Sequence, residues 1–392
     1  MPPIAGVVSS IAAFIGRALK GPANTPTHVG SFAEFTRIFG GLRRDEARRY
    51  SMPYAVSHFF QNGGSDALIV RVAAARGEDA DGHDMTDAEI LGDRDSRTGI
   101  FALESADLFN LLCIPPYGVE WDVAEGTWGV AARYCQERRA VLLVDAPAAW
   151  TAGAPDPVLA AAEGVASLRA SVGDDFARSA AVYFPRLLMP DPLNEGRPDE
   201  FAPCGAVAGV IARTDNERGV WKAPAGPKAS LAGVIGLTYT LADAEIERLT
   251  SLGLNCLRSI GEGGNVIWGA RMLAGAGDSP SESKYLPVRR FALYLEESID
   301  RGTRWADFEP NAEPLWARLR LDVNAFLDGL FRQGAFQATR PGDAYFVKCG
   351  RETTTEQDID AGVVNLLVGF APLRSAEFMV VRIRRTAGRA RT

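Results

Sequence analysis

The clearest hydrophobic periodicity lies in the last third of the chain, where apolar positions recur every three or four residues. One such stripe covers residues 315–331, with Asn311 as a candidate cap and Gly334 at its end, and it predicts an amphipathic helix. A second stripe over residues 288–299 stops at Gly302 and predicts another helix. Together with two strands that follow, the region is typical of an α+β domain.

At the end of this region apolar residues alternate in the pattern of a final strand. Because no later segment of the chain can pair with it, we expect an unpaired edge, and such an edge recruits another strand or aggregates. The region carries no group of residues suited to chemistry, so the pattern favours a protein that joins to copies of itself. Along this strand Met379, Val381 and Ile383 face one way, while Phe378, Val380, Arg382 and Arg384 face the other. The candidate joint residues are Phe378, Met379, Val380, Val381, Arg382, Ile383, Arg384 and Arg385.

Local start and stop signals place two further helices. Ser31 is a candidate N-cap with Glu34 three residues later, and Gly40 is the expected end of that helix. The pair Thr355 and Asp358 resembles a capping box for a short helical run near the end of the chain.

The middle of the chain alternates between short apolar strands and helical segments. Residues 140–147 are apolar almost throughout, as in a strand that is buried on both faces of a parallel sheet. Strands separated by helices point to a mainly parallel sheet with helices on its faces. The segments expected as strands are 4–15, 67–72, 108–116, 140–147, 180–190 and 256–260, and those expected as helices are 54–60, 128–139, 158–168, 204–215 and 241–253.

Composition supports a folded chain of more than one domain. At 392 residues, with 47% hydrophobic and 23% charged residues, the chain is long enough for two or three buried cores. The net charge is −7, whereas the last thirteen residues hold five arginines and no acid. An acidic body argues against general nucleic-acid binding. The basic tail is either a solvated end or a segment that meets acidic surface on a neighbouring subunit.

Cysteine usage and hydropathy exclude several other classes. The five cysteines are far apart and form no CxxC pair, so reduced thiols in a cytoplasmic fold are the simplest interpretation, without a zinc site or a disulfide framework. No apolar run approaches the roughly 18 residues that a membrane span needs. The apolar opening over residues 4–16 lacks the preceding positive charge and the cleavage site of a signal peptide.

The α/β middle region invites an enzymatic interpretation, and Asp145 is its best candidate. This residue ends a buried strand, where open α/β sheets tend to place ligands, although an Asp there is often a helix cap or turn former. A serine hydrolase needs an imidazole base, and the only histidines are His28, His58 and His83, all before the middle domain. Their spacing fits no metal motif, and the glycine-rich segments 261–265 and 274–280 fit no nucleotide-binding pattern. We therefore expect no catalytic site, no metal and no cofactor.

Blocks spread over nearly the whole chain make it resemble the contractile tail sheath proteins of phages and of extracellular contractile injection systems. Each block is short, but their order along the chain is that of the family. The blocks are AAFIGRALKGP (12–22), SFAEFTRIFGG (31–41), FFQNGG (59–64), LFNLLCIPP (108–116), RRAVLLVDAP (138–147), FAPCGAVAGVIARTD (201–215), GVWKAPAG (219–226), LNCLRSI (254–260), VIWGARMLAG (266–275) and the C-terminal third.

The resemblance implies a structural protomer with a subtilisin-like α/β middle domain and a C-terminal α+β sheath core that the N-terminal segment completes. It also implies assembly into six-fold helical rings around an inner tube, contraction, and contacts with baseplate and tail-terminator or cap proteins, built in the producing cell's cytoplasm without membrane insertion of the sheath. Arg318 and Arg332, on the polar face of the 315–333 helix, are candidate contacts to the tube. The resemblance further implies that the last strand is one half of a joint with a neighbouring protomer, with Met379, Val381 and Ile383 as its packing face. The implied parts are an N-terminal segment (1–75) packing with the C-terminal core, an acidic linker (76–98), the α/β domain (99–270), the C-terminal core (271–377) and a C-terminal arm (378–392).

One departure and two alternatives accompany this interpretation. Family members usually begin with an arm of about twenty residues, whereas this sequence starts directly beside its first expected strand. An α/β hydrolase-like or nucleotide-binding enzyme is the first alternative. A baseplate or tail-end structural protein of the same machine is the second.

Overall fold

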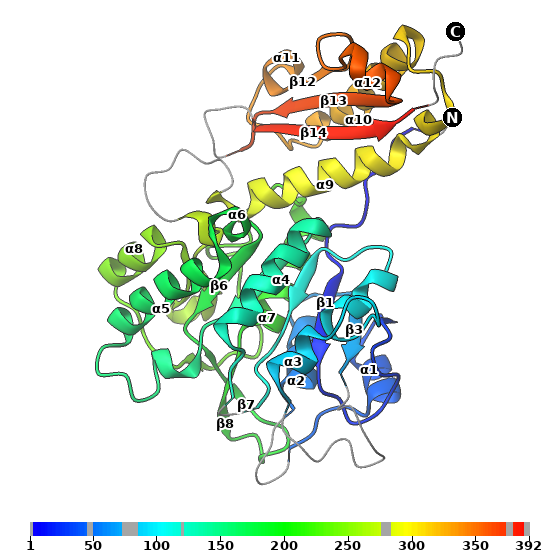
Figure 1. The fold of residues 1–392 in the computed structure, drawn as a ribbon. Coiled ribbons are helices and arrows are strands. Elements are labelled where there is room, and N and C mark those ends of the chain that lie inside the picture. Colours follow the sequence, from blue (N-terminus) through cyan, green and yellow to red (C-terminus); the bar gives the residue numbers. More distant parts are fainter. Residues whose placement is uncertain are drawn as a thin grey trace. The chain divides into compact units, whose positions relative to one another are not determined.

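The computed structural model describes residues 3–44, 50–72, 85–118, 121–275, 284–373 and 379–387. The chain folds into two compact units (Figure 1). The larger unit, here called the α/β unit, consists of residues 9–218 and 223–286. The smaller, here called the C-terminal unit, consists of residues 1–8, 219–222 and 287–392.

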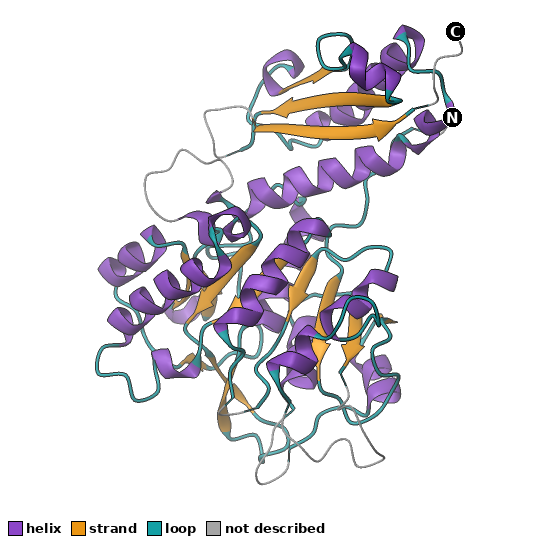
Figure 2. Ribbon diagram, viewed as in Figure 1, coloured by secondary structure: helices purple, strands orange, loops and turns teal. Residues whose placement is uncertain are grey.

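An eight-stranded sheet is the centre of the α/β unit, with helices on both faces (Figure 2). Its order is β11-β10-β6-β5-β4-β1-β3-β2, and the pairs from β10 through β3 are parallel, while β11 and β2 are antiparallel at the edges. The expected mainly parallel sheet is thus confirmed. The strands are β1 (Ala12–Gly16), β2 (Thr27–Val29), β3 (Ala67–Arg71), β4 (Leu111–Cys113), β5 (Val141–Asp145), β6 (Ala180–Phe184), β10 (Leu254–Ser259) and β11 (Asn265–Ile267).

Two groups of helices cover the opposite faces of this sheet. Leu112 and Leu142 point into the core that α4 and α5 close, whereas the thiol of Cys113, on the other face, lies 3.8 Å from the carbonyl oxygen of Cys204 in α7. Phe14 of β1 meets Phe59 of α2 on that second face, with ring centroids 5.5 Å apart. The helices of this unit are α1 (Phe32–Phe39), α2 (Ser51–Gln61), α3 (Asp87–Leu91), α4 (Glu125–Glu137), α5 (Pro157–Val172), α6 (Asp174–Ala177), α7 (Cys204–Arg218) and α8 (Asp243–Ser251), with short 3₁₀ turns η1 (Gly99–Ser105), η2 (Ala148–Trp150), η3 (Gly261–Gly263) and η4 (Leu273–Gly275).

The segment 180–190, expected as one strand, forms two strands in different sheets. Pro185 has no N–H to continue a ladder, and the chain turns there from β6 into β7 (Leu187–Pro190). β7 lies in a separate three-stranded sheet between β8 (Pro198–Phe201) and β9 (Gly236–Leu237).

Two expected domain assignments are wrong. Residues 3–8 of the N-terminal segment do belong to the C-terminal unit, with Ile4 buried in its core, but most of the segment belongs to the α/β unit, because β1 pairs with both β3 and β4 inside the large sheet. Residues 85–98 of the expected linker also belong to this unit: Thr86 and Glu89 form a capping box for α3, and Ile90 is fully buried in the core. Residues 73–84 lie outside the described residues.

The C-terminal unit packs two long helices against an antiparallel sheet of order β12-β13-β14. Its elements are α9 (Leu286–Gly302), η6 (Arg304–Phe308), α10 (Glu313–Arg332), α11 (Pro341–Ala344), β12 (Tyr345–Lys348), α12 (Glu356–Asp360), β13 (Val363–Phe370) and β14 (Met379–Thr386). The predicted stripes are confirmed, since Leu295 and Ile299 of α9 and Leu319, Val323 and Leu327 of α10 are buried in one core.

Several local predictions in the sequence are confirmed and one is wrong. The Ser31 hydroxyl accepts a hydrogen bond from the Glu34 N–H at 3.2 Å, and Gly40 ends α1 with a φ of 96°. Asn311, however, does not cap α10, which begins after Ala312. Its amide instead donates to the Val363 carbonyl at 2.9 Å and accepts from the Trp316 indole N–H at 2.8 Å, so it ties α10 to β13.

Candidate assembly surface

The last described strand is an edge strand and is paired on one side only. β14 pairs with β13 over its whole length, from Met379 opposite Phe370 to Thr386 opposite Val363. The strand before it is thus its partner within the chain, and the expected unpaired edge is the other side of β14. Among the described residues no strand follows β14 in the sheet, so its other edge is free.

The two faces of β14 have different roles. Val381 and Ile383 are buried in the core of their own unit, with Met379 partly buried beside them. The expected packing face of the joint is thus used inside the chain, because it closes the sheet over α9 and α10. Val380, Arg382 and Arg384 are exposed on the opposite face. Phe378 and the last five residues of the chain lie outside the described residues.

The backbone groups that face the free edge can be identified from the pairing. The Ala387 N–H donates to the Gly362 carbonyl at 2.7 Å, which marks a hydrogen-bonded pair just beyond the strand. In an antiparallel ladder, opposite residues alternate between bonded and non-bonded pairs. The residues whose N–H and C=O groups point away from β13 are therefore Val380, Arg382, Arg384 and Thr386.

Arg385 fastens the end of β14 inside the C-terminal unit. Its side chain is 8% exposed and donates to the Asp300 carbonyl at 2.7 Å and to the Asp300 carboxylate at 2.9 Å. Its other terminal nitrogen lies 3.0 Å from an Asp307 carboxylate oxygen. The suggestion that the tail arginines are solvated or meet a neighbour is thus wrong for Arg385. Sequence reasoning missed this pairing because its two acids lie about 80 positions earlier.

Both candidate tube contacts lie exposed on α10. The Arg318 guanidinium stacks over the Trp305 ring at 4.7 Å from its centroid. Arg332 is exposed near the end of the same helix. Exposure leaves both side chains accessible to another protein, and their contact to a tube stays a prediction.

Asp145 has a structural position in the fold. One carboxylate oxygen accepts a hydrogen bond from the Cys204 backbone N–H at 2.7 Å, at the first residue of α7. Burial raises its pKa to about 6, against the opposing effects of the Cys204 hydrogen bond and the charge of Arg186. Of the two roles considered for this residue, the geometry favours the helix cap.

The two described histidines, His28 and His58, lie in separate places. His28 lies 3.1 Å from the Asp66 carboxylate on the surface, and His58 packs edge-on against Phe201 in a separate, buried position. His83 lies outside the described residues. Within the described ranges no group of three or more His, Cys, Asp or Glu side chains could hold a metal ion, and no helix is long and apolar enough to cross a membrane.

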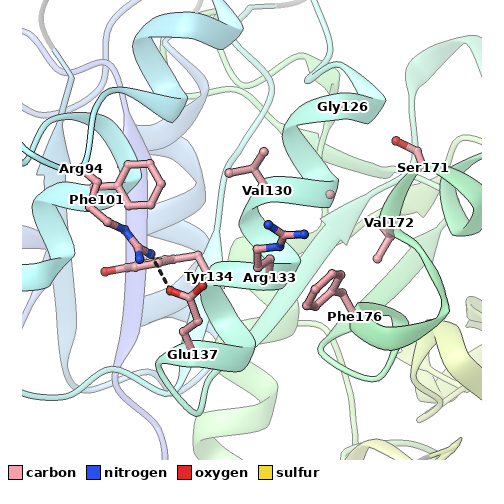
Figure 3. A pocket seen from close by; sticks show the side chains of 11 residues that line it. Arg94, Phe101, Gly126, Val130, Arg133, Tyr134, Glu137, Ser171, Val172 and Phe176 are labelled. Carbon is pink, nitrogen blue, oxygen red and sulfur yellow. Dashed lines mark hydrogen bonds and ion pairs between the residues drawn. The ribbon is translucent and has the colours of Figure 1, made fainter.

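A groove of about 490 Å³ crosses the outer face of α4 (Figure 3). On one side Arg94 forms an ion pair with Glu137 at 2.5 Å and stacks over Phe101. On the other side Arg133 lies over the Phe176 ring at 4.9 Å. The Ser171 hydroxyl of the lining donates to the Glu125 carbonyl at 3.0 Å.

Comparisons with known proteins agree with this geometry. Residues 278–386 match the family model of the phage tail sheath C-terminal domain. The tail sheath protein of Enterobacteria phage T4 is 27% identical over 182 residues, which is 46% of this chain and 26% of the phage protein. The aligned part thus spans about a quarter of the length of that curated relative.

Solved structures extend the similarity over nearly the whole chain. A chain in the contracted helical sheath of the anti-feeding prophage is 26% identical, with a TM-score of 0.70 over 97% of this chain and 94% of that one. A chain in the six-fold symmetrised baseplate of the same particle is also 26% identical, with a TM-score of 0.73 over 97% and 95%. The family-model match and the similarity in sequence and fold together point to a contractile sheath protein of the phage-tail and injection-system class. Residues 278–386 match the sheath C-terminal domain, and the chain as a whole is similar to tail sheath proteins.

Proposed function

We propose that this chain is the repeating protomer of a sheath that polymerises in six-fold helical rings around an inner tube and contracts to drive the tube through a target envelope. The free edge of β14 carries the proposal. It presents four outward N–H and C=O pairs on a strand that its own unit holds rigidly, which is the arrangement that accepts an added strand from another chain.

Strand addition between different surfaces of identical protomers gives a heterologous contact. Such a contact propagates into an open helical array when the rotation does not close a ring. The similarity to a protein of a contracted helical sheath supports this geometry. Contraction then re-forms interfaces between near-rigid protomers, while the paired strands keep neighbours connected.

The partners follow from the same proposal. They are copies of the chain itself, an inner tube protein, and baseplate and terminator or cap proteins, assembled in the cytoplasm of the producing cell. Arg318 and Arg332 are proposed contacts to the tube. The proposed role is structural and not catalytic; Asp145 is engaged as a cap, and the described histidines His28 and His58 lie apart.

A baseplate component of the same machine is the second candidate, because a chain in a baseplate structure matches this fold as well as a chain in a sheath structure does. Copy number separates the two. Electron microscopy of particles that contain a labelled chain should show it along the whole shaft if it is the sheath, and at one end only if it is a baseplate component.

A proline at the free edge tests strand addition directly. The Arg382 N–H points away from β13, so Arg382→Pro removes one outward donor without removing a bond of the β13–β14 ladder. We expect Arg382→Pro to fold and to fail in polymer formation, as measured by sedimentation and negative-stain microscopy. Arg382→Ala keeps the N–H and is the matched control. Polymers of wild-type length from Arg382→Pro would contradict the proposal.

A further inference from the structure

The free edge of β14 ends beside the turn η6. The Asp307 carboxylate of this turn accepts hydrogen bonds from the Arg385 guanidinium at 3.0 Å and from the Thr386 hydroxyl at 3.3 Å. Successive side chains of a strand point to opposite faces of the sheet. Because the side chains of Arg385 and Thr386 point to opposite faces and both reach the Asp307 carboxylate, this carboxylate lies beside the strand and not over one face. β13 occupies one side of the strand, so the carboxylate lies on the other side. Hence η6 flanks the free edge at its Thr386 end.

The next residue of this turn is the most exposed large apolar side chain among the described residues. Phe308 is 89% exposed, whereas Leu321 and Ile235, the two that follow, are 69% and 57% exposed. Pairing of Asp307 with β14 holds the adjoining backbone of Phe308 beside the edge, so its exposed ring is available there to another chain. Aromatic side chains that become buried when two chains associate contribute much of the binding free energy of many interfaces.

We propose that Phe308 is the anchor for the strand that β14 receives from a second copy of this chain. The outward backbone groups of Val380, Arg382 and Arg384 supply hydrogen bonds that any extended segment can make. The backbone hydrogen bonds do not select a register. Phe308 lies at one end of the edge and therefore favours a single register of the incoming strand. That strand places an apolar side chain against the ring at the position next to Thr386.

Charge also favours a second copy as the occupant. Lys348, Arg382 and Arg384 all lie on the face of the sheet that the packed helices leave open, as the cross-strand pairing shows. Outside its last thirteen residues the chain is more acidic than its net charge of −7 indicates, because that tail carries five arginines and no acid. A second copy of the chain is acidic outside its tail, so it is attracted electrostatically to this basic sheet face when its strand is added.

This inference rests on the proposed strand addition, and paired variants distinguish the two. In Phe308→Ser the ring is lost from a position that makes no buried contact in the free chain, so we expect unchanged folding and at least an ~10-fold higher critical concentration for polymer formation. Leu321→Ser, an exposed apolar residue on α10 in the same unit, is the control and should change it less than ~2-fold. Phe308→Tyr keeps the ring and should restore most of the assembly.

The outcomes separate the anchor from the edge. If Arg382→Pro blocks assembly and Phe308→Ser assembles like the wild type, the anchor is wrong and strand addition stands. If both variants assemble normally, strand addition itself is wrong. Hydroxyl-radical footprinting of the unmodified protein gives a second test: oxidation of Phe308 should fall at least ~5-fold on assembly if its ring becomes buried, and equal oxidation in the free and assembled chains would overturn the anchor.

Discussion

Replacing Arg385 by Met should destabilise the C-terminal unit far more than the same change at its exposed neighbour Arg384. Arg385 is 8% exposed and holds Asp300 and Asp307, whose side chains are 24% and 34% exposed. The substitution keeps much of the apolar stem and removes the cation, so two carboxylates lose their common partner.

The magnitude follows from the burial of the three groups. Breaking a buried ion pair by removing one partner costs about 3–5 kcal/mol. Because water reaches both acids in part, we expect the lower end of this range, about 3 kcal/mol. At Arg384 the guanidinium is exposed on the open face of the sheet, and we expect a change within about 0.5 kcal/mol.

Urea unfolding of the free chain, followed by a probe in the C-terminal unit, measures both variants. The midpoint for Arg385→Met should move to clearly lower urea with an unchanged slope. Equal midpoints for the two variants, or a decrease in the free energy of unfolding below about 1 kcal/mol for Arg385→Met, would show that the ion pairs of Arg385 with Asp300 and Asp307 do not hold the end of β14.

Three other predictions concern the α/β unit and the thiols. The pKa of Asp145 is about 6 in the folded chain against an ordinary value of 3.8, so between these pH values the folded state holds a proton that the unfolded state loses. The free energy of unfolding should therefore fall by roughly 3 kcal/mol as pH rises from about 4 to above 6. Asp145→Asn should abolish this dependence in unfolding measurements at several pH values, and an unchanged pH profile would refute the assignment. Gly205→Ala should cost about 1–3 kcal/mol because a Cβ there would lie 2.1 Å from the Ala55 carbonyl oxygen, whereas Gly126→Ala, with open space around it, should be neutral or slightly stabilising. All five cysteines are buried, and burial raises the thiol pKa of Cys256 and Cys349 to about 12, so native protein at pH 8 should react with a thiol reagent only after denaturation; rapid labelling of the folded chain would contradict the packing around them.

Local signals in the sequence predicted local structure well. The Ser31 cap with Gly40 as the end of α1, and the capping box of Thr355 and Asp358, are formed as expected because their partners lie within a few residues. The period of apolar residues also identified the buried faces of α9 and α10, since the period alone determines which side chains share a face.

The pairing of strands could not be predicted in this way. The alternation of apolar residues in β14 identified its buried face but not the strand that pairs with it. β13 was not recognised as this partner because only later segments were considered. β1 has the pattern of an ordinary apolar strand, yet its place between β3 and β4 depends on contacts across about 100 residues. The partners of Arg385 and the position of η6 beside the free edge depend on the same long-range folding.

Cryo-electron microscopy of polymers formed by the full chain tests the central claim most directly. We expect a six-fold helical array in which a strand from a neighbouring copy is hydrogen-bonded to the outward groups of Val380, Arg382 and Arg384. An array in which the free edge of β14 faces solvent, or a closed oligomer that does not propagate, would contradict the claim that this edge joins the protomers.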